Sequence, residues 1–488
     1  MGFNYLASLS HYVPELLACF TMFTLVLFEA TFKTNTKRTA PFYIVATLGL
    51  VAVLMALFKT LHSDSINIFT NSISIDPFST FLKIVMVFGT ILSIYVSHVS
   101  NDIGKDQKGE FAILVTGVLV GAMLLASANN MLILYIGIET LSILSYALAS
   151  LQKNDDRSTE AGLKYSLYGA MSSGIMLFGL SIVFGVFGTI NFSEIATQIS
   201  TISTTQVAVL VPSFLLVLAG LGYKIACVPF HMWSPDVYEG SPIPVTSFFA
   251  VVPKFAGVAA IVRITFLFFH DTSVLSVSWV GILSVIAVLT MTVGNVSAIG
   301  QRSVKRMLAY SSISHAGVIL LGVIVVDKIG LDAILFYSVA YVFMNMLAFF
   351  ITTLIQNNFG NDHFERFSGL IKKYPLIAIL MTVTMLSLAG IPPFAGFIAK
   401  FNILAALVSK KLYTLAIIAV VNSVVSVYYY MKVVRLMIFN KPESEEPLKD
   451  FTLINQGLCL AMTLPIVLLG IYWSSIINLI EHTSILFK

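Results

Sequence analysis

Charged residues are scarce in this chain of 488 residues: Asp, Glu, Lys and Arg together make up 11%, against 57% hydrophobic residues. An ordinary soluble domain carries roughly 25% charged residues. So few charges could not cover the surface of several water-exposed domains. The composition therefore excludes a soluble protein and predicts one that lies within a lipid bilayer.

Cysteines and clustered charges are also lacking. Cys19, Cys227 and Cys459 lie far apart in apolar segments, which argues against an iron–sulfur cluster, structural zinc or a disulfide framework. The 28 basic and 24 acidic residues are scattered, so there is no patch that would bind nucleic acid. We therefore expect no metal, no redox cofactor and no nucleic-acid partner for this chain.

Apolar runs of about twenty residues recur along the whole sequence. As helices, runs of this length cross a hydrocarbon core of about 30 Å, and they lack the alternation of barrel strands. We predict an all-α polytopic membrane protein with about 14 transmembrane helices. The spans fall at about residues 13–31, 40–59, 77–97, 110–127, 130–150, 162–188, 206–227, 242–269, 275–299, 304–325, 331–356, 375–409, 412–439 and 452–477.

The basic residues predict the orientation of these spans. Fifteen Lys and Arg residues fall in loops after odd-numbered spans, and five fall on the other side. Because cytoplasmic loops are enriched in Lys and Arg, both termini should face away from the cytoplasm. This bias also supports an even number of spans.

A few charged residues lie inside spans, where each costs about 2.5 to 3.5 kcal/mol at a helix centre. Glu139 lies near mid-span with Ser142 and Tyr146 on the same helix face. Lys224 precedes Pro229, which breaks the helix one residue past the lysine and leaves free carbonyls beside it. Burial disfavours a charged lysine and a nearby carboxylate favours it, so we interpret Glu139 and Lys224 as proton-relay residues. A structural ion pair and a kink that only shapes packing are the alternatives.

The next span contains two further basic residues. Lys254 follows Pro253 and is expected to lie centrally. Arg263 lies farther along and is expected to extend towards the far membrane surface. Only Lys254 is predicted to be a relay residue.

A straight helix over residues 375–408 would measure roughly 50 Å, far more than the bilayer core. This helix must therefore break, and Pro392 and Pro393, flanked by glycines, mark the place. Lys400 falls just beyond this break, as Lys224 falls just before its own. It is the fourth predicted relay residue.

Two interrupted helices, each with a lysine, are typical of transporters built from inverted repeats. His315 occupies the span that corresponds to the span of Glu139, and a histidine that titrates near neutrality is a possible relay residue; a histidine held for packing is equally plausible. The predicted units are an N-terminal three-helix segment at 1–109, two five-helix repeats at 110–269 and 275–439, and a C-terminal loop with the last span at 440–488.

His231, Asp236 and Glu239 lie together between two spans. Their spacing does not match that of metal ligands. We expect them to hold this loop in place.

Three sequence stretches resemble a known family. They are Val-Pro-Phe-His-Met-Trp-Ser-Pro-Asp-Val-Tyr-Glu-Gly-Ser-Pro at 228–242, Lys-Arg-Met-Leu-Ala-Tyr-Ser-Ser-Ile-Ser-His-Ala-Gly at 305–317, and Gly-Ile-Pro-Pro-Phe-Ala-Gly-Phe at 390–397. Together they closely resemble the antiporter-like membrane subunits of respiratory complex I, and the resemblance runs over nearly the whole chain. The Pro-Asp-Val-Tyr-Glu-Gly form resembles the subunit N branch, whereas subunits L and M and the multisubunit sodium/proton antiporters more often have Ala-His after Pro-Asp. Lys400 also fits subunit N, because subunit M has glutamate in that place.

This resemblance implies a proton channel in a redox-driven NADH:quinone oxidoreductase of the bacterial cytoplasmic (inner) membrane. Glu139 would modulate the channel, Lys224 would load the proton, Lys254 would connect the two halves, and Lys400 would lie nearest the exit. His231 and His315 match family positions and are possible relay residues.

The resemblance also implies partners and cofactors. NADH, FMN, the iron–sulfur clusters and quinone would bind to partner subunits, and this chain would be a non-redox subunit of the translocase. The expected partners are the antiporter-like subunit M and the small subunits K, J and A. The alternatives are a subunit of a multisubunit sodium/proton antiporter and a structural membrane scaffold with vestigial charges.

Overall fold

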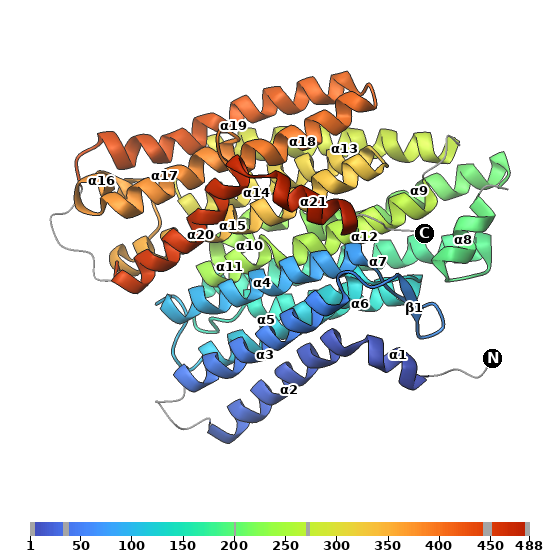
Figure 1. Ribbon diagram of the computed structural model, residues 1–488, viewed down its shortest axis with the longest axis horizontal. Helices are drawn as coiled ribbons and strands as arrows, with labels where there is room; N and C mark the ends of the chain where they lie inside the picture. Colours follow the sequence, from blue (N-terminus) through green and yellow to red (C-terminus); the bar gives the residue numbers. More distant parts are fainter. Residues whose placement is uncertain (1–4, 33–38, 200–201, 270–273, 443–450, 484–488) are drawn as a thin grey trace.

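The computed structural model describes residues 5–32, 39–199, 202–269, 274–442 and 451–483. Most of them lie in helices that run side by side along the horizontal axis of Figure 1. In this part of the chain, thirteen helical segments are long and apolar enough to cross a bilayer. Two further apolar helices of 15 residues each, α17 (Pro375–Ala389) and α18 (Ala395–Ser409), take the place of the predicted span at 375–409. The prediction of an α-helical, multi-pass membrane protein is confirmed.

The N-terminal part of the chain contains one feature that the sequence analysis did not predict. Its helices are α1 (Tyr5–His11), α2 (Val13–Phe32), α3 (Thr39–Thr60) and α4 (Pro77–Val99). Between α3 and α4, the strands β1 (Ile66–Ile68) and β2 (Ile73–Ile75) form a small antiparallel hairpin. Each strand alternates isoleucine with a polar residue, which is the period of a half-buried strand. This hairpin is an addition to the predicted all-α fold.

The remaining helices follow in two runs and a C-terminal pair. The first run contains α5 (Lys108–Ala126), α6 (Met131–Ala149), α7 (Asp156–Phe187), α8 (Phe192–Ile199), α9 (Thr204–Ile225), α10 (Trp233–Gly240), α11 (Ile243–Phe249) and α12 (Val252–Phe268). The second run contains α13 (Val274–Ile299), α14 (Val304–Ile324), α15 (Lys328–Phe359), the 3-10 helix η1 (Phe364–Phe367), α16 (Leu370–Lys373), α17, α18 and α19 (Tyr413–Phe439). The pair is α20 (Leu453–Ile471) and α21 (Ser474–Thr483). The last span is therefore shorter than the predicted 452–477.

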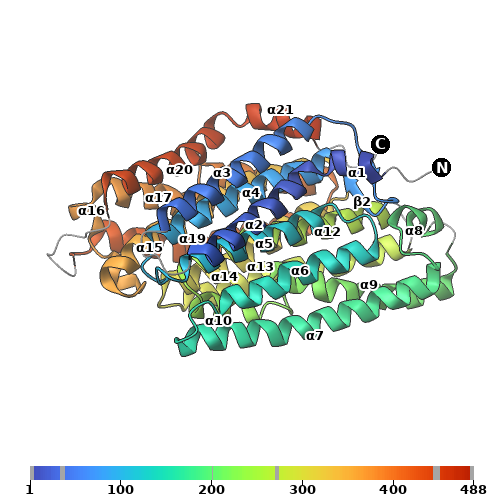
Figure 2. The same ribbon diagram turned by 90° about the horizontal axis from the view of Figure 1, so that it is seen from below.

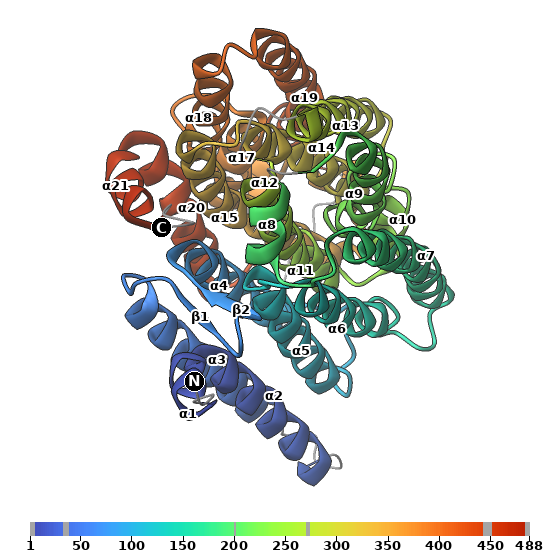
Figure 3. The same ribbon diagram turned by 90° about the vertical axis from the view of Figure 1, so that its right-hand side faces the viewer.

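The centre of the bundle is fully buried, and its outer faces are apolar. Viewed along the helices, α12, α14 and α15 lie near the middle, while α2 and α3 project at one side (Figure 3). α7 runs along an outer edge for most of its length (Figure 2). Helices that are apolar all round are suited to such a centre, whereas outer helices bury only one face. The polar side chains of α12 and α14 are thus shielded by protein.

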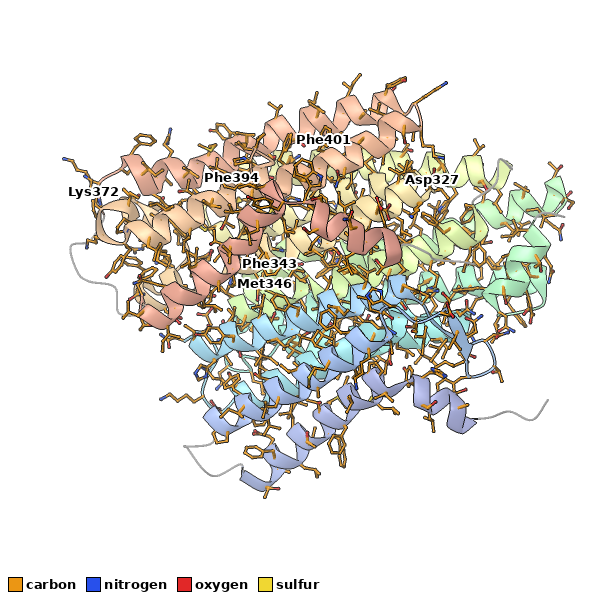
Figure 4. The ribbon with its side chains drawn as sticks, in the orientation of Figure 1. Asp327, Phe343, Met346, Lys372, Phe394 and Phe401 are labelled. Atoms are coloured by element: carbon orange, nitrogen blue, oxygen red, sulfur yellow. The ribbon has the colours of Figure 1, made fainter. Side chains whose placement is uncertain are left out.

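The two ends of the bundle are marked by charged residues. Figure 4 shows Lys372 at one end and Asp327 at the other. We call the end with Lys372 the basic end, because α16 lies in one of the loops rich in lysine and arginine. We call the end with Asp327 the far end.

Three spans are interrupted, two of them where the sequence predicts. α9 ends at Ile225, one residue past Lys224, and α10 begins at Trp233 with Pro229 in the gap. α17 ends at Ala389 and α18 begins at Ala395, with Pro392 and Pro393 between them. Both predicted helix breaks are confirmed.

The third interruption corrects the prediction of one continuous span at 242–269. α11 ends at Phe249 and α12 begins at Val252. Pro253 lies in the first turn of α12, where its missing amide hydrogen costs no helical hydrogen bond. Lys254 is therefore next to a helix start and not in a helix interior.

Candidate functional site

Lys224 is the first member of a row of buried titratable side chains. It lies at the end of α9, and its Nζ is 5.3 Å from the ring centroid of Tyr165, 5.7 Å from that of Tyr223 and 5.9 Å from that of Tyr146. Aromatic faces attract an ammonium group. No described residue accepts a hydrogen bond from this Nζ. The free carbonyls predicted beside Lys224 therefore do not bind it, and three aromatic rings surround it instead.

Glu139 lies on α6 and is half-buried. Its Oε1 is buried, and among the described residues it has no hydrogen-bond partner. Glu139 and Lys224 make no direct ion pair. Tyr146, on the same face of α6, is one of the rings around Lys224. The predicted polar face of α6 thus points towards Lys224, with the two charges held apart.

Lys254 lies in the first turn of α12 and is fully buried. Its Nζ donates to the carbonyl oxygen of Ser312 at 2.5 Å and also to the Ser312 hydroxyl. α12 packs closely on α9, since a Cβ added to Gly257 would lie 3.5 Å from the Cβ of Lys224. Gly257 is one helical turn from Lys254. The two lysines therefore lie on adjacent helices, and Lys254 connects α12 to α14.

His315 lies one turn beyond Ser312 on α14 and is buried. Its Nδ1 is 2.5 Å from the Tyr337 hydroxyl, and its Nε2 is 3.0 Å from the Tyr430 hydroxyl. A neutral imidazole donates from one nitrogen and accepts at the other. His315 is therefore placed to take a proton on one side and release one on the other.

A small polar cavity separates His315 from Lys400. Its volume is about 10 Å³, which is room for about one water molecule. Asn295 and Asn422 also line it, together with Ser426 and Tyr429.

Lys400 lies on α18 just past the second predicted break. Its Nζ donates to the carbonyl oxygen of Ala389, the last residue of α17, at 2.9 Å. Gly390 has φ +85°, and a Cβ there would lie 2.8 Å from Cδ of Lys400. The arrangement of a lysine with a free helix-end carbonyl thus occurs at Lys400, although it was predicted at Lys224.

His231 lies outside this row, half-buried in the loop between α9 and α10. Its Nδ1 has no hydrogen-bond partner among the described residues. In the same segment, Asp236 pairs with Lys164 at 2.9 Å and with Arg306 at 3.2 Å. Ion pairs of α10 therefore hold this segment, as expected for Asp236 and Glu239.

Comparison with known proteins places the chain in a family. Residues 128–426 match the family model described as NADH:quinone oxidoreductase/Mrp antiporter, TM. NADH-quinone oxidoreductase subunit N of Moorella thermoacetica is 40% identical over 448 residues, which covers 91% of this chain and 92% of that protein. This chain belongs to the NADH-quinone oxidoreductase subunit N family.

Solved structures agree with this assignment. One chain of respiratory complex I from Thermus thermophilus with bound aureothin has 27% identity and a TM-score of 0.81, and the match covers 96% of this chain and all of that one. A chain of the Mrp complex from Dietzia sp. has 22% identity and a TM-score of 0.84, with 97% of each chain covered. At this lower identity, the Mrp match shows a shared fold.

Two further buried charges of this subunit N family member form ion pairs outside the row. The prediction that Arg263 extends to the far surface is wrong: it is 1% exposed, and its Nη2 lies 2.7 Å from Asp76 Oδ2. Asp76 also caps α4, so this ion pair joins α4 to α12. Lys83 pairs with Glu15 at 2.5 Å and joins α4 to α2. Both pairs tie the N-terminal helices together and to the first run.

Four tyrosines of the site were not predicted from the sequence. Tyr165 and Tyr223 surround Lys224, whereas Tyr337 and Tyr430 bind His315. A buried tyrosine hydroxyl needs a hydrogen-bond partner. Tyrosines inside apolar spans were therefore the signal that could have located them.

No cluster of three His, Cys, Asp or Glu side chains able to hold a metal ion occurs in the described ranges. Chemically, the site consists of amines, a carboxylate, an imidazole and phenols in a dry interior. These groups bind and release protons. The arrangement suits proton transfer.

Proposed function

We propose that this chain is a proton-translocating membrane-arm subunit of NADH:quinone oxidoreductase, with Glu139, Lys224, Lys254 and Lys400 as the proton relay. The observation that carries the proposal is the placement of the buried groups: Lys254 bonds to Ser312 on α14, His315 lies one turn farther on the same helix, and His315 and Lys400 line one small cavity. Each charge in an apolar interior costs free energy. A scaffold would gain nothing from keeping three lysines in one row.

The energy for transport arrives from quinone reduction elsewhere in the complex, as a charge or a conformational change transmitted along the membrane. It changes the separation of Glu139 and Lys224. A near carboxylate favours the charged lysine, and a distant one releases the proton. The proton then passes to Lys254 and through His315 to Lys400.

This chain supplies no complete redox site, and it acts as a non-redox subunit of the translocase. NADH, FMN, the iron–sulfur clusters and quinone bind to partner subunits. The neighbours in the membrane are the antiporter-like subunit M and the small subunits K, J and A. His231 remains a possible relay residue of a different conformation.

The complex lies in the bacterial cytoplasmic (inner) membrane, with both termini of this chain on the non-cytoplasmic side. The excess of basic residues in loops after odd-numbered spans supports this orientation. The regions 110–269 and 275–439 are two inverted five-helix repeats. The broken helices that end beside Lys224 and begin before Lys400 support that division.

A subunit of a sodium/proton antiporter is the second candidate, and the fold shared with the Mrp complex favours it. Val237, Tyr238 and Glu239 disfavour it, because they replace the Ala-His typical of that group. Purifying the native assembly and measuring flavin and iron–sulfur absorbance separates the candidates. Both signals are expected for NADH:quinone oxidoreductase, and their absence would favour the antiporter.

The relay is tested by Lys224→Ala in membranes that contain the assembled complex. We expect NADH-driven proton pumping to fall, because the amine that loads the proton is removed. Lys410→Ala is the control, since Lys410 is 43% exposed and pairs with Asp327 at the far end of the bundle. Normal pumping by Lys224→Ala at normal assembly would contradict the proposal.

A further inference from the structure

α10 is a two-turn helix with a loop at each end, and it lies between a surface pocket and the central lysines. The pocket has a volume of about 430 Å³ and is lined by charged side chains of α7, α10 and α14. It contains acidic and basic residues in equal measure. A pocket of this kind is hydrated and does not select a ligand of one charge.

The outer face of α10 is held by four side chains, which we call the α10 ion-pair cluster: Lys164, Asp236, Glu239 and Arg306. Lys164 Nζ lies 2.9 Å from Asp236 Oδ2, and Arg306 Nη2 lies 3.2 Å from Asp236 Oδ1. Arg306 Nη1 also pairs with Glu239. One exposed pair contributes about 0–1 kcal/mol. Lys164 also pairs with Glu160 on its own helix at 2.7 Å. Three residues of the cluster thus have two partners each, and the cluster acts as a network that joins α7, α10 and α14.

α14 also holds the loop that follows α10. Lys305 is buried, and its Nζ donates to the Ser241 carbonyl oxygen at 3.1 Å. The consecutive residues Lys305 and Arg306 thus bind both α10 and its C-terminal loop. The position of α10 is therefore set by α14, the helix that also carries Ser312 and His315.

The inner face of α10 contacts the surroundings of Lys224. The Trp233 ring stacks on Tyr165, with centroids 4.3 Å apart and an angle of 13° between the planes. Trp233 Nε1 donates to the Tyr223 carbonyl oxygen at 2.9 Å. Tyr165 and Tyr223 are two of the three rings around Lys224. Trp233 therefore fixes the rings that hold the lysine.

A second buried side chain of α10 lies towards the surroundings of Lys254. Tyr238 is fully buried on α10, which packs against α14, the helix that carries Ser312. Ser312 binds the Lys254 Nζ through its carbonyl and hydroxyl oxygens. Trp233 and Tyr238 are five residues apart on one helix. A shift of α10 therefore changes the environments of both lysines at once.

We propose that α10 couples the Lys224 site to the Lys254 site, with the α10 ion-pair cluster positioning the helix. Asp236 is the central positioning residue, because it binds α7 and α14 together. Proton transfer requires donor and acceptor within about 2.6–3.2 Å, directly or through one water. A displacement of about 1 Å would therefore interrupt it. This inference rests on the proposed proton relay.

The test compares Asp236→Asn with the control Asp327→Asn. Asp236→Asn removes the charge shared by Lys164 and Arg306 and keeps the side-chain size. Asp327 pairs with Lys410 at the same 2.9 Å, with similar exposure, at the far end of the bundle. Lys410 holds the pKa of Asp327 below its ordinary value, so the control carboxylate is also charged at neutral pH.

The readout is NADH-driven proton pumping per assembled complex in inside-out membrane vesicles. We expect at least a threefold loss for Asp236→Asn, recovery in Asp236→Glu, and no change for Asp327→Asn. Lys164→Met, which removes one of the two cations bound to Asp236, replaces Asp236→Asn if that variant fails to assemble. Wild-type pumping in the assembled variant would overturn the coupling.

A second measurement separates coupling from a merely structural role. Asp236 and Tyr238 lie on opposite faces of α10, so Asp236→Asn and Tyr238→Phe have no shared contact. If α10 couples the sites, the pumping rate of the double variant is at least that of the slower of the two single variants. A double effect equal to the product of the two single effects would overturn the inference.

The proposed relay is checked in the same series through Lys254→Met. If Lys254→Met lowers pumping and the α10 variants do not, only the coupling by α10 is refuted. If Lys254→Met also pumps normally, the relay itself is refuted.

Discussion

A substitution of Lys254 tests the row directly, because Lys254 lies between the Lys224 site and His315. Lys254→Met keeps most of the side-chain length and removes the amine. It deletes the two hydrogen bonds to Ser312, and bonds to charged groups contribute about 1.5–3 kcal/mol each. It also removes the cost of keeping a charge in an apolar interior. The two effects oppose each other, so we expect the complex to assemble.

The effect on transport is larger than the effect on stability. Lys254→Met removes the amine that donates to Ser312, and proton transfer needs a donor and an acceptor within hydrogen-bond reach, directly or through one water. We expect pumping to fall at least tenfold, which corresponds to about 1.4 kcal/mol in the activation barrier.

The assay measures NADH-driven acidification of inside-out membrane vesicles, divided by the amount of assembled complex. Electron transfer from NADH to an artificial acceptor reports whether the redox part of the complex is intact. Lys410→Met serves as the control, because it removes an exposed lysine at the far end. Wild-type pumping by Lys254→Met would refute the reasoning that places this amine in the path.

Two further variants test the packing of the bundle, both by the thermal stability of the assembled complex. Lys83→Met leaves Glu15 buried and unpaired, which costs about 3–5 kcal/mol; the double change with Glu15→Leu should recover most of the loss, and no recovery would contradict the ion pair. Gly390→Ala should lose about 1–2 kcal/mol through its positive φ and also slow pumping, because the new Cβ meets Lys400 at 2.8 Å. Gly457→Ala, with no heavy atom within 4 Å of the added Cβ, should be tolerated.

The sequence predicted the features that depend on local chemistry. Spans follow from runs of apolar residues, and the breaks beside Lys224 and before Lys400 follow from proline, glycine and segment length. The break before Lys254 was not predicted. Pro253 is compatible with a kink in one continuous span and also with the first turn of a new helix. Local sequence did not distinguish the two cases.

The features that depend on distant partners were not predictable. Arg263 was expected to reach the surface, but its partner Asp76 is 187 residues away in the sequence. Tyr430 binds His315 across 115 residues. A single sequence shows that such groups are buried, but it does not show which of them meet in the fold. The roles of the residues in the row are therefore predictions from their chemistry, and the geometry of the site supports them.

The central claim is that Glu139 and the buried lysines carry protons. Its most direct test is the rate of NADH-driven proton pumping by the purified complex in liposomes, compared between the wild type and Glu139→Gln. The account predicts a several-fold lower rate for Glu139→Gln, with electron transfer from NADH to an artificial acceptor unchanged. Equal pumping rates in the two complexes would contradict it.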